Sequence, residues 1–177
     1  MAGGLKKGYI QIYTGNGKGK TTAALGLALR AAGNELSVFI GQFMKGQDYG
    51  ELKAVQQLAP FITIEQFGQP TFVHVDKATE EDIRLAQQGL ARCREAMLSN
   101  RYDIVILDEV NVAIFFRLLK TEQILELFEQ KPEQVELILT GRYAPEALIE
   151  KADLVTEMRE IKHYYSQGVV ARKGIEK

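Results

Sequence analysis

A short stretch near the N-terminus combines glycines, lysines and hydroxyls in a spacing that suits phosphate binding. It runs Thr14-Gly15-Asn16-Gly17-Lys18-Gly19-Lys20-Thr21 and is followed by Thr22. Closely spaced glycines let backbone N–H groups turn toward an anion with no Cβ in the way. The lysine ammonium adds a point charge, and a threonine hydroxyl can bind a magnesium ion. This stretch therefore predicts a site for a phosphate chain with Mg²⁺ beside it.

The same stretch resembles the P-loop motif G-x-x-x-x-G-K-[ST], with Thr14 where the first glycine is expected. It follows an apolar run over 9–13 and precedes an alanine- and leucine-rich run over 21–32, which predicts a strand, a loop and a helix in that order. The positive end of the helix would then face the loop. The alternative is a glycine-rich turn that happens to contain lysines, and the strand–loop–helix setting disfavours it.

A second group of candidate residues follows the apolar run 104–107, which ends in Asp108 and Glu109. A buried strand that ends in carboxylates at the carboxyl edge of a sheet is typical of a Mg²⁺-binding acid in nucleotide-binding proteins. We expect Asp108 or Glu109 to bind Mg²⁺, directly or through water, although a strand ending in a polar turn is the alternative. Arg142 follows the predicted strand 135–140 at the same edge. It is a candidate for contact with nucleotide or substrate, although a solvated arginine is the commoner outcome.

No side chain stands out as a general base. His74 and His163 are the only histidines, and no cysteine lies near them at ligand spacing, which argues against a zinc site. Cys93 falls within a helical pattern and is predicted to be a core residue. A nucleotide site without a candidate base indicates a reaction that does not need one.

The elements that must position these residues alternate along the chain. Strands are predicted over 9–13, 37–43, 62–67, 104–107, 135–139 and 154–161, and helices over 21–32, 49–58, 79–99, 121–130 and 145–152. Thr79, with Asp82 three residues on, predicts a capping box at the start of the longest helix. The segment 68–78 has no period and is predicted to be a loop. The alternation predicts an α/β fold, a single domain over 1–177, with a mostly parallel sheet covered by helices on both faces.

Composition excludes several classes of protein. The chain has 177 residues, is 46% hydrophobic and carries a net charge of −1, which argues against disorder and against a nucleic-acid-binding protein. Its longest apolar run, 112–116, is too short to span a membrane. A single cysteine favours the cytoplasm. The positive charge is nevertheless concentrated before the first acid, Glu35, which predicts a small bound anion there; the residues are Lys6, Lys7, Lys18, Lys20 and Arg30.

Several stretches, taken in order from about residue 8 to the end, resemble those of the P-loop ATP:corrinoid adenosyltransferases. Besides Tyr13 to Ala24, they are Gln42-Phe43-Met44-Lys45-Gly46, Ile106-Leu107-Asp108-Glu109, Leu139-Thr140-Gly141-Arg142, Ala152-Asp153-Leu154-Val155-Thr156-Glu157-Met158, Lys162-His163 and Ala171-Arg172-Lys173-Gly174-Ile175-Glu176.

The resemblance implies a P-loop (RecA-like) domain that transfers the 5′-deoxyadenosyl group of MgATP to Co(I) of a reduced corrinoid. Tripolyphosphate leaves, and the reaction serves adenosylcobalamin biosynthesis or salvage. Because Co(I) has no proton to lose, the missing base is accounted for. The implied ATP contacts are Gly15, Asn16, Gly17, Lys18, Gly19, Lys20, Thr21, Thr22 and Arg142. Lys20, Thr21 and Glu109 are the implied catalytic residues, and Thr21 and Glu109, with Asp108 in support, are the implied ligands of Mg²⁺.

The resemblance also implies where the corrinoid lies: over the loop 68–78 and near 42–46, with Phe72, His74, Gln42 and Lys45 as contacts. The family usually has a Phe, one residue and then a Trp in this loop, whereas this chain has Phe72 and His74 and no Trp. Its implied partners are ATP, the reduced corrinoid, a second copy in a homodimer and a reductant such as a flavoprotein. Neither a nucleic acid nor a membrane is expected as a partner.

Two other functions remain open from the residues alone. A P-loop ATPase or kinase would cleave the β–γ bond and would need a residue that positions water or an acceptor hydroxyl; Gln42 is the candidate. A non-catalytic module would bind corrinoid or nucleotide without turnover. Tripolyphosphate, ADP with phosphate, and no product distinguish the three functions.

Overall fold

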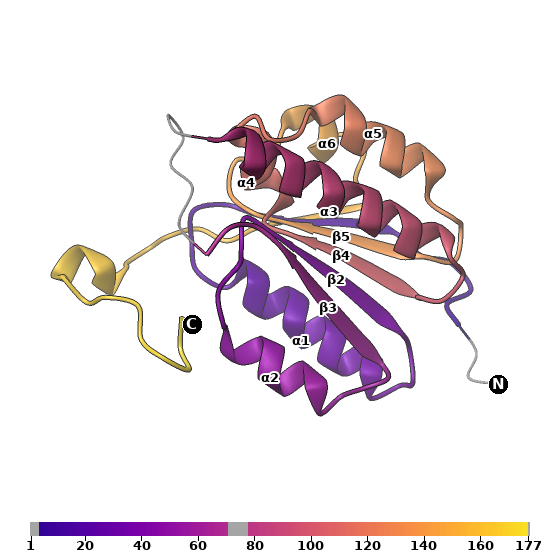
Figure 1. The fold of residues 1–177 in the computed structure, drawn as a ribbon, viewed down its shortest axis with the longest axis horizontal. Helices are drawn as coiled ribbons and strands as arrows, with labels where there is room; N and C mark the ends of the chain where they lie inside the picture. The colour runs from indigo at the N-terminus through magenta and orange to yellow at the C-terminus, as the bar shows by residue number, and fades with distance from the viewer. Residues whose placement is uncertain (1–3, 71–77, 177) are drawn as a thin grey trace.

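The computed structural model describes residues 4–70 and 78–176, and a six-stranded sheet runs through its centre (Figure 1). The strands are β1 (Ile10–Thr14), β2 (Val38–Phe43), β3 (Ile62–Phe67), β4 (Ile104–Asp108), β5 (Glu136–Thr140) and β6 (Leu154–Glu157). Their order across the sheet is β3-β2-β4-β5-β1-β6, and every neighbouring pair is parallel. All six carboxyl ends therefore lie at one edge, as the predicted α/β fold requires.

Helices cover both faces of this sheet, which confirms the predicted layering (Figure 1). One face carries α1 (Lys20–Ala32) and α2 (Gly50–Gln56), and the other carries α3 (Glu80–Leu98), α4 (Val110–Phe115), α5 (Thr121–Gln130) and α6 (Glu146–Ile149). The predicted capping box at α3 is present, since the Thr79 hydroxyl accepts from the Asp82 amide while the Asp82 carboxylate accepts from the Thr79 amide. Both groups satisfy N–H donors that the helix itself leaves free.

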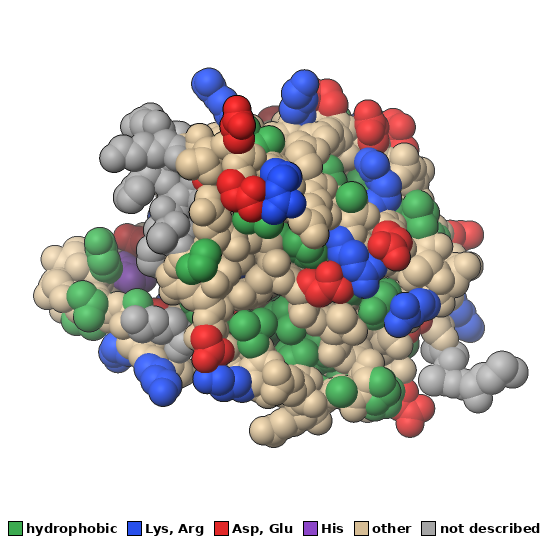
Figure 2. Space-filling view, viewed as in Figure 1, with side chains coloured by type: hydrophobic (Ala, Val, Ile, Leu, Met, Phe, Trp, Pro, Cys, Tyr) green, Lys and Arg blue, Asp and Glu red, His purple; other side chains and the backbone are tan. Residues whose placement is uncertain are grey.

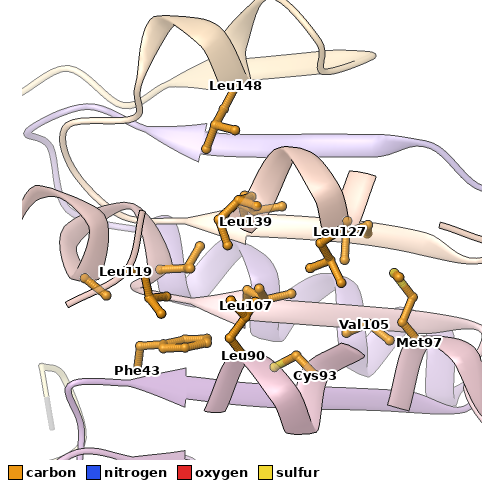
Figure 3. Close-up of a cluster of buried hydrophobic side chains, with 14 of the residues drawn as sticks. Phe43, Leu90, Cys93, Met97, Val105, Leu107, Leu119, Leu127, Leu139 and Leu148 are labelled. Atoms are coloured by element: carbon orange, nitrogen blue, oxygen red, sulfur yellow. The ribbon is translucent and has the colours of Figure 1, made fainter. Parts of the chain in front are cut away.

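The core lies in two layers, one on each face of the sheet. The larger layer packs the sheet against α3, α4, α5 and α6, and Figure 3 shows its side chains. The smaller layer packs alanines of α1 and Val55 of α2 against the opposite face. The central strands β2, β4 and β5 are buried at every residue, as expected of parallel strands covered on both faces. The outermost strand β6 is exposed at every residue.

Three elements differ from the sequence prediction, one of them an unpredicted 3₁₀ helix, η2 (Tyr164–Gln167). Helix α4 was not predicted, because its six residues are too few and too uniformly apolar to display a helical period. The last strand was predicted to continue to residue 161 but ends at Glu157, where the chain turns to contact the loop after β1. Among the helices of the described ranges, none is both long and apolar enough to cross a bilayer.

Candidate nucleotide site

The loop between β1 and α1 follows a path that only glycine tolerates at several positions. Gly15 and Gly19 have φ of 93° and 118°, in the left-handed region that favours glycine. A Cβ on Gly15 would lie 2.5 Å from the Met158 carbonyl oxygen. The chain after β6 supports the loop, because the Gly17 amide donates to the Met158 carbonyl (2.6 Å) and the Met158 amide donates to the Thr14 carbonyl (2.8 Å). Thr14 itself ends β1 in extended pairing, so that position needs no glycine.

The N-terminus of α1 opens directly from this loop with its donors free. Gly19 occupies the N-cap position without a side-chain cap, and the first turn contains no acidic residue. The first-turn amides and the positive end of the helix dipole therefore favour an anion at this place. The Lys20 ammonium donates to the carbonyl oxygens of Gly15 and Gly17, both at 2.8 Å. Burial lowers the pKa of Lys20 and Arg142 lowers it further, while Glu109 and Asp108 oppose the shift.

Asp108, at the end of β4, is the centre of a buried hydrogen-bond network and is 1% exposed. One carboxylate oxygen accepts from the hydroxyls of Thr21 (2.8 Å) and Thr140 (2.7 Å). The other accepts from the Lys45 ammonium (2.8 Å) and the Gln42 amide (3.2 Å). These four donors fill the hydrogen-bonding capacity of the Asp108 carboxylate. Because the Thr21 hydroxyl donates its hydrogen bond to Asp108, the lone pairs of its oxygen are free to bind a cation.

Glu109 follows Asp108 directly but has a different environment. Its φ of 64° places it in the left-handed region, and its amide donates to the Thr140 hydroxyl at 2.9 Å. With this backbone conformation, Glu109 lines the cavity described next. Burial raises the pKa of Glu109, and the adjacent Asp108 charge adds to the shift, whereas Lys45, Lys20 and Arg142 oppose it. The nearby cations therefore do not fully offset the cost of charging Glu109 at the carboxyl edge of the sheet, and such a setting is typical of functional groups.

A cavity of about 640 Å³ lies over the loop and these acids, within the range of small-molecule sites. Four cations line it: Lys18, Lys20, Lys45 and Arg142. Three glutamates, Glu51, Glu109 and Glu176, also belong to its wall. Its remaining lining comes from the P-loop, α1, the start of α2 and the C-terminal segment: Gly17, Gly19, Thr21, Thr22, Leu25, Tyr49, Gly50, His163, Gly174 and Ile175. The balance of charge suits a phosphate chain accompanied by a cation.

The C-terminal segment extends away from the sheet, and its end turns back toward the P-loop (Figure 1). Four of its residues line the cavity: His163, Gly174, Ile175 and Glu176. The Lys18 ammonium donates to the Ile175 carbonyl at 3.0 Å and lies 3.8 Å from Glu176. Glu176 in turn accepts from Arg172 at 3.2 Å and from the Tyr164 hydroxyl. The segment thus places a carboxylate beside the phosphate site.

Comparison with known proteins identifies the family. Residues 6–176 match the family described as ATP:corrinoid adenosyltransferase BtuR/CobO/CobP. The chain belongs to this family. A corrinoid adenosyltransferase from Sinorhizobium sp is 35% identical over 97% of this chain and 81% of its own length. One from Escherichia coli strain K12 is 32% identical over 97% of this chain and 86% of its own. The corrinoid adenosyltransferase CobA of Salmonella typhimurium is 31% identical over the same shares.

The residues implied by the resemblance fall into three groups in this adenosyltransferase fold. Those on the cavity wall are Gly17, Lys18, Gly19, Lys20, Thr21, Thr22, Lys45, Glu109 and Arg142. Gly15 shapes the loop and Asp108 anchors Thr21 from below, while Asn16 lies in the same loop without lining the cavity. Gln42 is 0% exposed, with its amide between Asp108, Glu51 and Gln66. Phe72 and His74 lie outside the described residues.

Sequence reasoning missed part of this wall. Tyr49 and Glu51, at the start of α2, carry no motif that points to a nucleotide. His163 was considered as a metal ligand and as part of the resemblance, and Glu176 only as part of the resemblance. The C-terminal segment could have been identified from the run 171–176, which resembles the family although no local structural pattern accounts for it.

The residues present fit a magnesium ion at this place. Mg²⁺ prefers oxygen ligands and is usually held by one or two carboxylates together with substrate phosphates. The Thr21 hydroxyl, oriented by Asp108, and the Glu109 carboxylate offer such oxygens on the wall of the cavity. Within the described ranges no group of three or more His, Cys, Asp or Glu side chains could hold a metal ion, so the phosphates would have to complete the coordination.

Proposed function

We propose that this protein transfers the 5′-deoxyadenosyl group of MgATP to Co(I) of a reduced corrinoid and releases tripolyphosphate, in adenosylcobalamin biosynthesis or salvage. The observation that carries the proposal is the cationic cavity over the P-loop, lined by Lys18, Lys20, Lys45 and Arg142 in a chain of the corrinoid adenosyltransferase family. Together with the free amides at the start of α1, these cations suit a triphosphate better than any uncharged substrate.

The proposed reaction is one displacement. The cobalt electron pair attacks the ribose C5′, the C5′–O5′ bond breaks, and the tripolyphosphate departs with that bond's electrons as cobalt passes from Co(I) to Co(III). No proton is removed from the nucleophile, so no general base is required. The protein must hold the two substrates in line and stabilise the charge of the leaving group. Lys18, Lys20, Arg142 and the first-turn amides of α1 would do the latter.

Mg²⁺ would be held by the Thr21 hydroxyl and the Glu109 carboxylate, with Asp108 orienting Thr21. When bound, the ion would neutralise part of the phosphate charge. The incomplete compensation of Glu109 described above supports this assignment, because a nearby divalent cation would favour the charged carboxylate.

The proposal extends to the setting in which the protein works. Co(I) would be supplied by a reductant such as a flavoprotein, in the cytoplasm.

A homodimer is supported by β6, whose residues are all exposed and include the apolar Leu154 and Val155, because a bare apolar edge strand is usually covered. On the face shown in Figure 2, acidic and basic side chains are interspersed, which supports small substrates over a polyanion. Light scattering in solution tests the dimer.

Cleavage of the β–γ bond, as in an ATPase or kinase, would need a residue that positions water, and the position of Gln42 does not support that role. Gln42 was the candidate for positioning a water molecule, but its amide is fully buried and already bonded within the network around Asp108.

The test is an anaerobic assay with chemically reduced cobalamin, MgATP and the purified protein. Growth of a light-sensitive adenosylcobalamin spectrum with stoichiometric tripolyphosphate is the expected result. Formation of ADP and phosphate without a new cobalt–carbon bond would refute the proposal.

A further inference from the structure

Lys45 lies between β2 and α2, in a segment predicted to meet the corrinoid, yet it lines the cavity over the P-loop. It is 2.8 Å from a carboxylate oxygen of Asp108 and 3.8 Å from one of Glu51, and its side chain is only 15% exposed. The charge therefore sits beside the same acid that orients Thr21. Burial alone would lower the pKa of Lys45, but Asp108, Glu51 and Glu109 more than offset this and raise it, so the ammonium stays charged.

The donors of Lys45 are not exhausted by these contacts. An ammonium has three N–H groups, and within the described residues Asp108 accepts the only hydrogen bond from it. Glu51, at 3.8 Å, is an ion-pair partner beyond hydrogen-bond reach. The ammonium also lies over the Tyr49 ring, 5.3 Å from its centroid. With one N–H group on Asp108 and one facing this ring, a third remains for an anion, and Lys45 is part of the cavity wall together with Lys18, Lys20 and Arg142.

The backbone that carries Lys45 is held tightly in place. A Cβ on Gly46 would come within 2.8 Å of the Gln69 carbonyl oxygen, and one on Gly68 would lie 2.7 Å from Met44 Cα. The Met44 amide also donates to the Phe67 carbonyl at 3.1 Å. The segment thus lies against the end of β3, and the ion pair with Asp108 holds the ammonium at the far end of the side chain. The charge is therefore positioned before any ligand arrives, as effective electrostatic stabilisation requires.

We propose that Lys45 binds the triphosphate of ATP, and not the corrinoid, and stabilises the tripolyphosphate as the C5′–O5′ bond breaks. This inference rests on the function proposed above and adds a cation from the β2–α2 connection to those of the P-loop. Lys45 keeps its proton throughout, contributing charge and hydrogen bonds to the phosphate oxygens. The competing explanation is that Lys45 only neutralises the buried Asp108.

A double-mutant cycle separates these explanations. Lys45→Met is made in the native chain and in Asp108→Asn, and the affinity for inorganic tripolyphosphate is measured by calorimetry in EDTA, without corrinoid. A direct phosphate contact predicts a roughly tenfold or greater loss of affinity in both backgrounds, as for a charge-assisted hydrogen bond. If Lys45→Met has no effect once Asp108 is neutral, the proposal is overturned. Lys53→Met is the matched control, because Lys53 is 67% exposed on α2, and thermal melts confirm that each variant is folded.

Turnover provides a second readout. For Lys45→Met we expect a higher KM for ATP and a lower kcat, with an unchanged KM for the corrinoid. A rise in the corrinoid KM alone would overturn the proposal in favour of a corrinoid contact. Failure of the proposed function is a separate result: the native protein would bind tripolyphosphate with the Lys45 dependence described, yet would form no adenosylcobalamin.

Discussion

Asp108 and Glu109 are consecutive carboxylates with opposite environments. Asp108 accepts hydrogen bonds from Thr21, Thr140, Lys45 and Gln42, so its charge is compensated inside the protein. Glu109 is turned by its left-handed backbone toward the cavity, and burial raises its pKa. One acid therefore organises the site, while its neighbour is left to meet a ligand.

Lys20→Ala tests the proposed principal contact with the phosphates. We expect turnover to fall by about 10²-fold or more, the scale seen when one donor to a developing anion is removed. Steady-state rates with saturating reduced corrinoid measure the effect, and Lys120→Ala, at the exposed start of α5, is the control for lysine loss. Near-native activity of Lys20→Ala would show that the loop does not hold the triphosphate.

Glu109→Gln should stabilise the folded protein while impairing catalysis. The raised pKa means that the charged form of Glu109 is disfavoured by folding, so its penalty is absent below the unfolded pKa of 4.5 and complete above the folded pKa. In EDTA and without nucleotide, we expect Glu109→Gln to raise Tm at pH 7–8 by about 2–4 °C, the shift that about 1 kcal/mol gives at this size. The gain should vanish at about pH 4. A Tm increase that is independent of pH would contradict this explanation.

Helix α3 packs closely against β2 and β3. A Cβ on Gly41 of β2 would lie 2.5 Å from the Cys93 sulfur, and one on Gly89 of α3 would lie 2.8 Å from the Phe67 ring. Cys93 is fully buried, and burial raises its thiol pKa, as befits a core residue rather than a nucleophile. These small residues let α3 lie flat on the strands whose carboxyl ends carry Gln42 and Lys45.

Two glycine-to-alanine substitutions in helices should have opposite effects on stability. Gly89→Ala must displace the Phe67 ring, and we expect it to destabilise the fold by about 1–3 kcal/mol, as overpacking does. Gly26→Ala, in α1, meets nothing within 4 Å and should stabilise by up to about 1 kcal/mol through helix propensity. Urea unfolding of both variants measures the difference, and equal effects would contradict the close packing of α3.

Across the whole molecule, the loop after β1 and the C-terminal segment meet at one site. Lys18, in the first loop, binds the Ile175 carbonyl across 157 residues of sequence, and Met158 supports the same loop after the last strand. The cavity is therefore complete only when the C-terminal segment lies across the P-loop, and that segment brings the negative charge of Glu176.

Glu176→Gln should tighten the binding of MgATP. The substitution removes a carboxylate from the cavity wall and frees Lys18 and Arg172 from an ion pair. Because these groups are partly exposed, we expect only up to about a fivefold gain in affinity at low salt, shrinking as salt rises. Calorimetric titration at two ionic strengths tests it, with the exposed Glu160→Gln as control. Weaker binding would mean that Glu176 positions Lys18 rather than competing with phosphate.

The sequence by itself determined the P-loop, the α/β alternation, the capping box at Thr79 and the two acids after a buried strand. Each of these depends on residues within one strand, one turn or one helix, where period and residue type dictate local conformation. The tertiary structure decided the rest. Lys45 reaches Asp108 across 63 residues, and Thr140 reaches it across 32. These contacts depend on the strand order β3-β2-β4-β5-β1-β6, and no local period encodes which strands become neighbours or which side chains then share one edge.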